Sequence, residues 1–178
     1  KEFHVGHLRN LCLGNAVFNV MTFNGFDAMP VSYINDFGIN VAKTLWLYNK
    51  KYIGQEPNEN KGSFLAKIYA EASNLLKTDK DGMREVLQIK KEIESRVGET
   101  YELWRKTKDW SIEQFESAYR DMRVKFNHTF YESELVNDGI DIVKSLIEKG
   151  ILKESDGAII ADLEAYGLGV LVVLRSDG

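Results

Sequence analysis

The chain has 178 residues, of which 44% are apolar and 28% are charged, a balance typical of a globular protein with a buried core. Its formal net charge of −4 gives no general attraction for nucleic acid, so any RNA contact must come from local patches or from outside this segment. The single cysteine excludes an intramolecular disulfide and a cysteine-rich zinc site, and no apolar run reaches the roughly 20 residues that span a bilayer. We therefore expect a protein of the reducing cytoplasm without a membrane partner.

The first predicted element is a helix that begins at Gly6 or His7. Apolar residues recur at three- and four-residue spacing and predict one buried face, formed by Leu8, Leu11, Cys12, Ala16, Val20 and Phe23. Because Cys12 belongs to this face, we expect a packed thiol rather than a nucleophile. Asn24-Gly25 predicts the end of the helix, since both residue types accept a left-handed conformation.

The next segments predict an α/β fold. Phe26 to Ile34 favours a strand with a bulge or an edge position at Pro30, and a loop over 35–38 leads into a helix over 39–52. The order helix, strand, loop, helix is typical of a doubly wound sheet. We expect part of a Rossmann-like nucleotide-binding domain whose first strand lies upstream of Lys1.

A change of character after residue 52 indicates an insertion. Residues 54–63 are polar and turn-rich and predict an exposed loop, whereas 64–106 are highly charged and favour helices. We interpret 53–110 as a mostly helical insertion between two parts of the main domain, 1–52 and 111–178.

The return to the main domain opens with a predicted helix. Ser111 and Gln114 have the spacing of a capping box, and alternating apolar residues over 124–130 predict a half-buried strand. A further helix is expected to be capped by Asp138 and closed by Gly150.

The last segments favour strands. Two short strands, 151–152 and 158–161, flank the turn Ser155-Asp156-Gly157 and predict a hairpin. The uninterrupted apolar run Val170–Leu174 predicts a buried parallel strand.

The chemistry is concentrated in the stretch His4-Val5-Gly6-His7-Leu8-Arg9-Asn10. Gly6 lies where a loop becomes a helix, so the backbone can approach a flat ligand, and the unpaired N–H groups of the helix start suit a phosphate. His4 and His7, three residues apart, can both point at one triphosphate and stabilise the charge that builds as pyrophosphate leaves. The alternative is a pair of capping or surface histidines. A zinc pair is disfavoured, because His128 is the only other histidine.

His4-Val5-Gly6-His7 resembles the "HIGH" signature of class I aminoacyl-tRNA synthetases, and Leu8-Arg9-Asn10 resembles its continuation in the arginine enzyme. Further elements similar to that family follow in the same order: Tyr33-Ile34-Asn35-Asp36-Phe37-Gly38, Tyr131-Glu132-Ser133, Asp156-Gly157-Ala158 and Leu174-Arg175-Ser176-Asp177-Gly178. These elements span nearly the whole chain.

The resemblance implies an arginine–tRNA ligase, which activates L-arginine with ATP and transfers it to tRNA(Arg). It implies catalytic roles for two residues, His4 and His7, and an ATP site formed by His4, Val5, Gly6, His7 and Asn10. The active-site floor would include Asp36, Gly38, Ser176 and Asp177. Mg²⁺ would be carried by the nucleotide, with no structural metal bound by the protein, and the full-length enzyme would be a monomer. We interpret the basic cluster Arg105, Lys106 and Lys108 as a solvated helix end rather than a contact for the tRNA acceptor end, and Trp46, Trp104 and Trp110 as packing residues.

Departures from the family limit what this segment can do. The lysine-rich "KMSKS" loop is absent, the arginine-recognising tyrosine and aspartate would lie beyond Gly178, and Asn40 stands where many relatives carry glutamine. Both ends resemble cuts through a larger fold, so we expect the segment alone to be inactive.

Other class members fit less well. The cysteine enzyme needs zinc-ligating cysteines, and the valine, isoleucine and leucine enzymes carry a far larger insertion than 53–110. Two alternatives remain open: a nucleotidyl-transferring α/β enzyme that shares the histidine signature but uses no tRNA, and a non-catalytic module that binds nucleotide or RNA.

Overall fold

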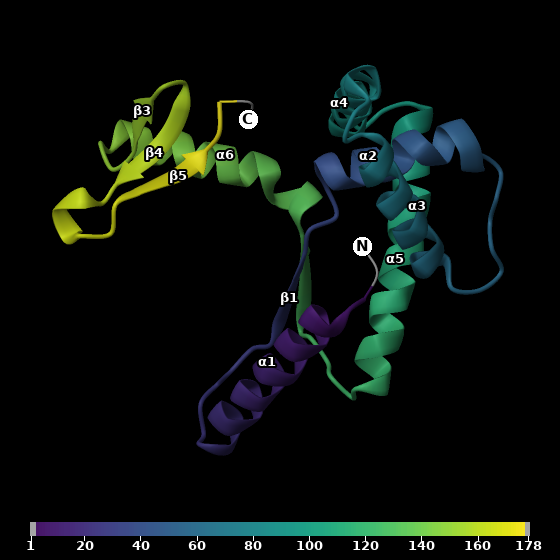
Figure 1. Cartoon of the computed structure of the whole chain (residues 1–178). Coiled ribbons are helices and arrows are strands. Elements are labelled where there is room, and N and C mark those ends of the chain that lie inside the picture. Colours follow the sequence, from purple (N-terminus) through teal and green to yellow (C-terminus); the bar gives the residue numbers. More distant parts are fainter. Residues whose placement is uncertain (1–2, 177–178) are drawn as a thin grey trace. The chain divides into compact units, whose positions relative to one another are not determined.

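A computed structural model describes residues 3–176, which divide into two compact units, Lys1–Tyr131 and Glu132–Gly178 (Figure 1). Within the described residues, no helix is both long and apolar enough to cross a membrane.

The first unit combines a short parallel sheet with a helical cluster. In chain order it contains α1 (Val5–Phe23), β1 (Val31–Ile34), α2 (Ile39–Leu47) with a π-helical extension (Tyr48–Tyr52), α3 (Lys61–Leu75), α4 (Lys80–Ser95), α5 (Glu99–Asp121) and β2 (His128–Tyr131). Strands β1 and β2 are parallel, with Val31 opposite His128 and Ile34 opposite Tyr131. The four helices between them form the long crossover that parallel strands require, so the unit is an α/β fold of mostly helical content.

The core of the first unit lies among α2, α3, α4 and α5 (Figure 1). Ala42, Ile68 and Val86 from three of these helices are fully buried. The three tryptophans are also buried, which confirms that they are packing residues. The indole Nε1 of Trp46 donates to the carboxylate of Glu85 at 2.7 Å, so the polar end of a buried ring is satisfied as well.

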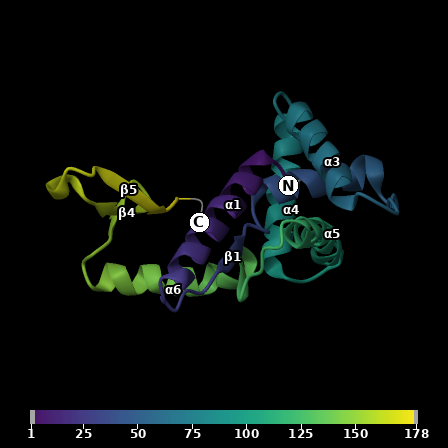
Figure 2. The same ribbon diagram turned by 90° about the horizontal axis from the view of Figure 1, so that it is seen from below.

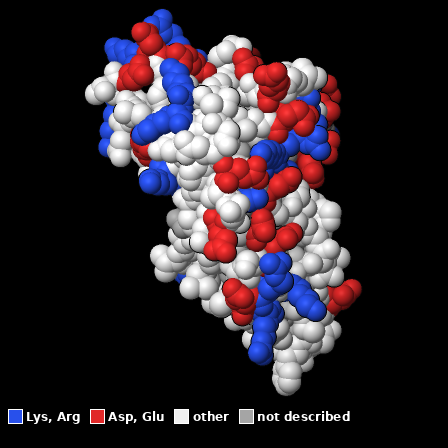
Figure 3. Space-filling model, turned by 90° about the vertical axis from the view of Figure 1, so that its right-hand side faces the viewer, with Lys and Arg blue, Asp and Glu red and all other residues white. Residues whose placement is uncertain are grey.

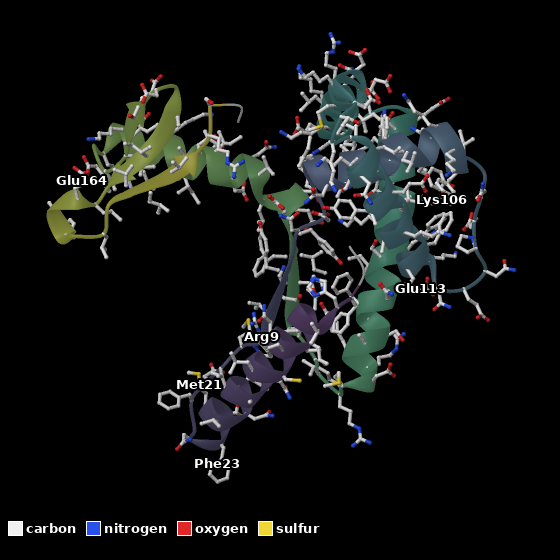
Figure 4. The ribbon with its side chains drawn as sticks, in the orientation of Figure 1. Arg9, Met21, Phe23, Lys106, Glu113 and Glu164 are labelled. Atoms are coloured by element: carbon white, nitrogen blue, oxygen red, sulfur yellow. The ribbon has the colours of Figure 1, made fainter. Side chains whose placement is uncertain are left out.

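Helix α1 begins at Val5, one residue before the predicted start, and ends where the sequence predicts, but its buried face is different. His4 is the N-cap, Asn24 is the C-cap, and Gly25 follows with a φ of +84°. The predicted packing of Cys12 is wrong, because that thiol is exposed, and Phe23 is 92% exposed and projects from the helix end (Figure 4). The apolar residues of α1 are distributed around its whole circumference, so their spacing alone could not identify the buried face. Among the described residues, neighbouring elements cover only the side that carries Leu11.

Strand β1 is shorter than predicted. It starts at Val31, and Phe26 to Pro30 are irregular, so the expected bulge does not arise. Pro30 stands immediately before the first paired residue, and its carbonyl accepts a hydrogen bond from the Asn127 N–H at 2.9 Å. A proline has no N–H to donate to a ladder, which explains why pairing begins after it.

Helix α5 is continuous through the position where the sequence predicted a new helix start. The Ser111 hydroxyl donates to the Thr107 carbonyl at 3.4 Å, and the Gln114 amide donates to the Ser63 hydroxyl of α3 at 3.3 Å. The expected capping box at these two positions is therefore wrong. Both side chains find partners inside the fold that local spacing cannot reveal.

The second unit contains a helix and a three-stranded antiparallel sheet. It contains α6 (Glu132–Glu148), β3 (Lys153–Ser155), β4 (Ala158–Asp162), a short 3₁₀ helix (Glu164–Tyr166) and β5 (Val170–Leu174), and β4 is the central strand (Figures 1 and 2). The predicted hairpin is confirmed, with left-handed conformations at Asp156 and Gly157 in its turn. Its first strand lies at 153–155 and includes Ser155, so the strand predicted at 151–152 is wrong.

Two predictions for the second unit are wrong. Asp138 lies inside α6 and does not cap it, although Gly150 follows the helix with the expected positive φ of +70°. Strand β5 pairs antiparallel to β4 and is mostly exposed, whereas a buried parallel strand was expected. The connection over 163–169 is too short for the crossover that a parallel neighbour needs.

Candidate active site

The histidine motif forms the start of α1 as a capping box. The Gly6 N–H donates to the Nδ1 of His4 at 3.0 Å, and the His4 N–H donates to the Nδ1 of His7 at 3.2 Å. The two imidazoles stack with their centroids 3.9 Å apart. Because Nδ1 accepts in both rings, each neutral imidazole carries its proton on Nε2. Both rings are therefore oriented donors at a helix N-terminus.

Gly6 has a structural role that the sequence did not predict. A Cβ on Gly6 would lie 2.9 Å from Cε1 and 3.0 Å from Nδ1 of His4, so a side chain would displace the capping ring. The Gly6 N–H, expected to be unpaired and available to a phosphate, is instead taken by His4. The glycine thus permits close approach, but the group that approaches is a neighbouring imidazole.

The His7 ring is held by aromatic contacts with α5. The ring of Phe115 meets it edge-on at 5.2 Å between centroids, and the ring of Phe3 lies at 5.6 Å. The Phe3 N–H donates to the Gln114 side chain at 3.2 Å, which fixes the segment before the motif to the same helix. These contacts restrict the imidazole to one orientation.

The loop after β1, residues 35–38, is anchored to α5 as well. The Trp104 Nε1 donates to the Asp36 carbonyl at 2.9 Å, and the Lys108 Nζ lies 2.5 Å from the Asp36 carboxylate. Gly38 then caps α2 with a φ of +102°, a conformation that favours glycine. The loop is therefore a fixed wall at the carboxyl end of β1.

A cavity of about 770 Å³ in the first unit brings part of the predicted site together. Three of the predicted site residues line it, His7, Asn10 and Asp36, together with Asn40. The other cavity walls include Leu11, Phe18, Tyr33, Thr44, Tyr69, Trp104, Lys108, Ser111 and Phe115. Its volume lies within the range typical of small-ligand sites.

The remaining predicted site residues have other locations. His4, Val5 and Gly6 lie next to His7 in sequence but do not line the cavity, and Gly38 likewise follows the lining residue Phe37. Ser176 is an exposed residue after β5 in the second unit. The predicted residue Asp177 lies outside the described residues.

The basic cluster on α5 does not form one surface. Arg105 pairs with Glu102, and Lys106 pairs with Glu56 at 2.5 Å, both at exposed positions, which confirms a solvated helix surface for these two. Hydrogen bonds from Lys106 and Lys61 lower the pKa of the Glu56 carboxyl. Acidic and basic side chains are interspersed over the face shown in Figure 3. The interpretation is wrong for Lys108, whose side chain is only 16% exposed.

Sequence reasoning did not identify Lys108 as a residue of the candidate site. A signal was present, because Lys108 follows Trp104 by four residues and therefore shares a helix face with a buried indole. A lysine on such a face needs a partner for its charge.

The chain resembles known proteins over its whole length. It is 37% identical to the arginine–tRNA ligase of Bdellovibrio bacteriovorus and 30% identical to that of Clostridium kluyveri. In each comparison all of this chain is covered, but only 32% and 31% of the relative, so the chain spans about a third of the length of these curated proteins.

Solved structures are similar in fold. The arginyl-tRNA synthetase of Plasmodium falciparum superposes with a TM-score of 0.73 at 22% identity, and that of Thermus thermophilus with 0.71 at 23%. All of this chain is covered, against 30% and 31% of those chains. The family described as "tRNA synthetases class I (R), catalytic domain" matches residues 1–178. The chain therefore belongs to the catalytic-domain family of the class I arginyl-tRNA synthetases.

Proposed function

We propose that the full-length protein is an arginine–tRNA ligase and that this chain supplies part of its adenylate-forming site. The observation that carries the proposal is the cavity lined by His7, Asn10 and Asp36, in a chain that matches the family over every residue. Residues from α1 and from the loop after β1, far apart in sequence, converge on it.

The proposed reaction has two steps. The carboxylate of L-arginine attacks the α-phosphorus of ATP, which forms arginyl-adenylate and releases pyrophosphate. A hydroxyl of the terminal ribose of tRNA(Arg) then attacks the acyl carbon, which forms arginyl-tRNA and releases AMP. Positioning of the reactants and stabilisation of phosphate charge account for most of such catalysis, and no covalent intermediate with the protein is needed.

Within this reaction we assign the phosphate contacts to His4 and His7. Their Nε2–H groups would donate to the phosphates, and the positive end of the α1 dipole would add roughly 0.3–1 kcal/mol. Val5, Gly6 and Asn10 complete the proposed ATP site, and Asp36, Gly38, Ser176 and Asp177 its floor. Glycine is needed at position 6 because the His4 ring accepts from its N–H and lies close to where a Cβ would be, and not because the nucleotide contacts it directly.

ATP is proposed to bring its own Mg²⁺. Asp36 carries the only carboxylate among the described residues that line the cavity, and it is already paired with Lys108. One neutralised carboxylate does not make a site for a hard divalent cation, which prefers several oxygen ligands. This donor set fits a cation bound chiefly by phosphate oxygens.

The domain boundaries and the wider fold are also proposals. The parallel pairing of β1 with β2 through a helical crossover supports a doubly wound, Rossmann-like sheet that continues beyond these two strands. We place the helical insertion at 53–110, between the parts 1–52 and 111–178 of the catalytic domain.

Aminoacylation of a tRNA(Arg) transcript by the full-length protein tests the proposal. Arginine should be charged and lysine strongly rejected, because a planar guanidinium allows bidentate recognition that an ammonium cannot provide. Charging of cysteine or glutamate instead would identify a different specificity. Arginine-dependent ATP–pyrophosphate exchange without any tRNA requirement would favour the tRNA-independent nucleotidyl-transferring alternative, and binding without turnover the non-catalytic one.

A further inference from the structure

One face of α5 contacts both chemical motifs of the candidate site. Trp104, Lys108 and Phe115 are spaced by four and seven residues and therefore lie on the same side of the helix. Phe115 packs against the His7 ring, while Trp104 and Lys108 both reach Asp36 in the loop after β1. A single helix face thus fixes the separation of the histidine motif and the loop.

Lys108 makes the shortest of these contacts. Its Nζ lies 2.5 Å from the Oδ2 of Asp36, whose side chain is only 3% exposed. The same ammonium lies 3.8 Å from the ring centroid of Tyr131, the last residue of β2, and 5.2 Å from that of Trp104. Because Ile34 and Tyr131 are opposite each other in the parallel pair, Lys108 ties together the carboxyl ends of both strands.

Because this ion pair is buried, each of its two charges is stabilised by the other. Removing one partner of a buried pair leaves an uncompensated charge, whereas replacing both partners by neutral groups is often tolerated. Among the described residues that line the cavity, Asp36 is also the only acidic residue and Lys108 the only lysine or arginine. Loss of Lys108 would leave the Asp36 carboxylate without this ammonium group, in the cavity where the phosphates of ATP are proposed to bind.

The geometry points to Lys108 as a positioning residue of the activation reaction. It holds Asp36, and through Asp36 the loop over 35–38, in the conformation that completes the cavity. This inference rests on the proposed function and deepens it.

The test uses arginine-dependent ATP–pyrophosphate exchange by the full-length enzyme with tRNA present. Lys108→Met is expected to lower kcat by about 10- to 100-fold, the range for misplacing one wall of a site, with a smaller effect on the KM for arginine. Lys106→Met is the matched control: it removes an exposed lysine of the same helix, paired with Glu56 in the loop over 53–60, and should stay within about 2-fold of wild type (Figure 4). Far-UV circular dichroism gives the folded fraction, so each rate is expressed per folded molecule.

A double-mutant cycle with Asp36→Asn separates positioning from general destabilisation. If Lys108 acts through Asp36, the double variant will be no slower than the slower single variant. Additive losses, or a kcat for Lys108→Met equal to that of Lys106→Met, would overturn the inference. Should Lys108→Met fail to fold, Asp36→Asn is compared with the double variant. The kcat of the double variant is expected to be no lower than that of Asp36→Asn, and a further loss in the double variant overturns the inference. A wild-type enzyme without arginine-dependent exchange would instead refute the proposed function.

Discussion

The cap formed by His4 predicts how substitutions of Gly6 change the free energy of unfolding. In Gly6→Ala, the new Cβ would lie 2.9 Å from the His4 ring, so the ring must turn away and the Gly6 N–H loses its acceptor. Loss of an N-cap typically costs about 1 kcal/mol, while alanine in place of glycine in a helix returns up to about 1 kcal/mol. The free energy of unfolding should therefore change little.

The same substitution should behave differently once the cap is gone. In a His4→Ala background there is no ring to displace, so Gly6→Ala is expected to stabilise the protein by up to about 1 kcal/mol. The coupling between the two positions should be about 1 kcal/mol. Gly14→Ala serves as the control, because nothing lies within 4 Å of its added Cβ, and it should stabilise in both backgrounds alike.

Urea unfolding followed by far-UV circular dichroism measures these differences, with equal slopes required for a valid comparison. If Gly6→Ala stabilised the protein equally with and without the His4 imidazole, the cap would not exist in solution. Glycine at this position would then serve direct contact with the nucleotide.

Further predictions concern the core and the ion pairs. Ile68→Ala should destabilise the first unit by about 2–5 kcal/mol in urea unfolding, because its side chain is fully buried, whereas Ile142→Ala at a 60% exposed position should cost far less. Hydrogen bonds from lysines lower the pKa of three carboxyl groups below 4.5, those of Glu56, Glu71 and Glu85. The stability that these carboxylates contribute is therefore present above that pH and is lost as the pH falls below it. Glu71→Gln should reduce the fall of the thermal unfolding midpoint at acid pH. The pKa of Lys51 and that of Lys106 are raised above 10.5 by hydrogen bonds to Glu71 and Glu56, so their contribution is present below that pH and should disappear at higher pH.

The sequence predicted those features that depend on local chemistry. Gly25 ended α1 with a positive φ, and Asp156 and Gly157 produced the hairpin turn with positive φ values, conformations that these residue types tolerate. The histidine motif was located correctly at a helix start, and the resemblance identified the family over the whole chain.

Features that depend on distant partners were not predictable. The spacing of apolar residues predicted that Cys12 is buried, but in the structure Cys12 is exposed and Leu11 is the buried residue of α1. Ser111 matched a capping box, but tertiary contacts carry α5 straight through it. Lys108 was assigned to solvent, because only the fold brings Asp36 and Tyr131 to its ammonium.

In the proposed reaction, His7 stabilises the charge that develops during arginine activation. Arginine-dependent ATP–pyrophosphate exchange by the full-length enzyme, with tRNA present, measures this step. His7→Ala should lower kcat by roughly 10²–10³-fold, the range for losing one preorganised donor, while the affinity for ATP changes much less. An unchanged exchange rate in folded His7→Ala would show that the histidine is only part of a helix cap and would contradict the account.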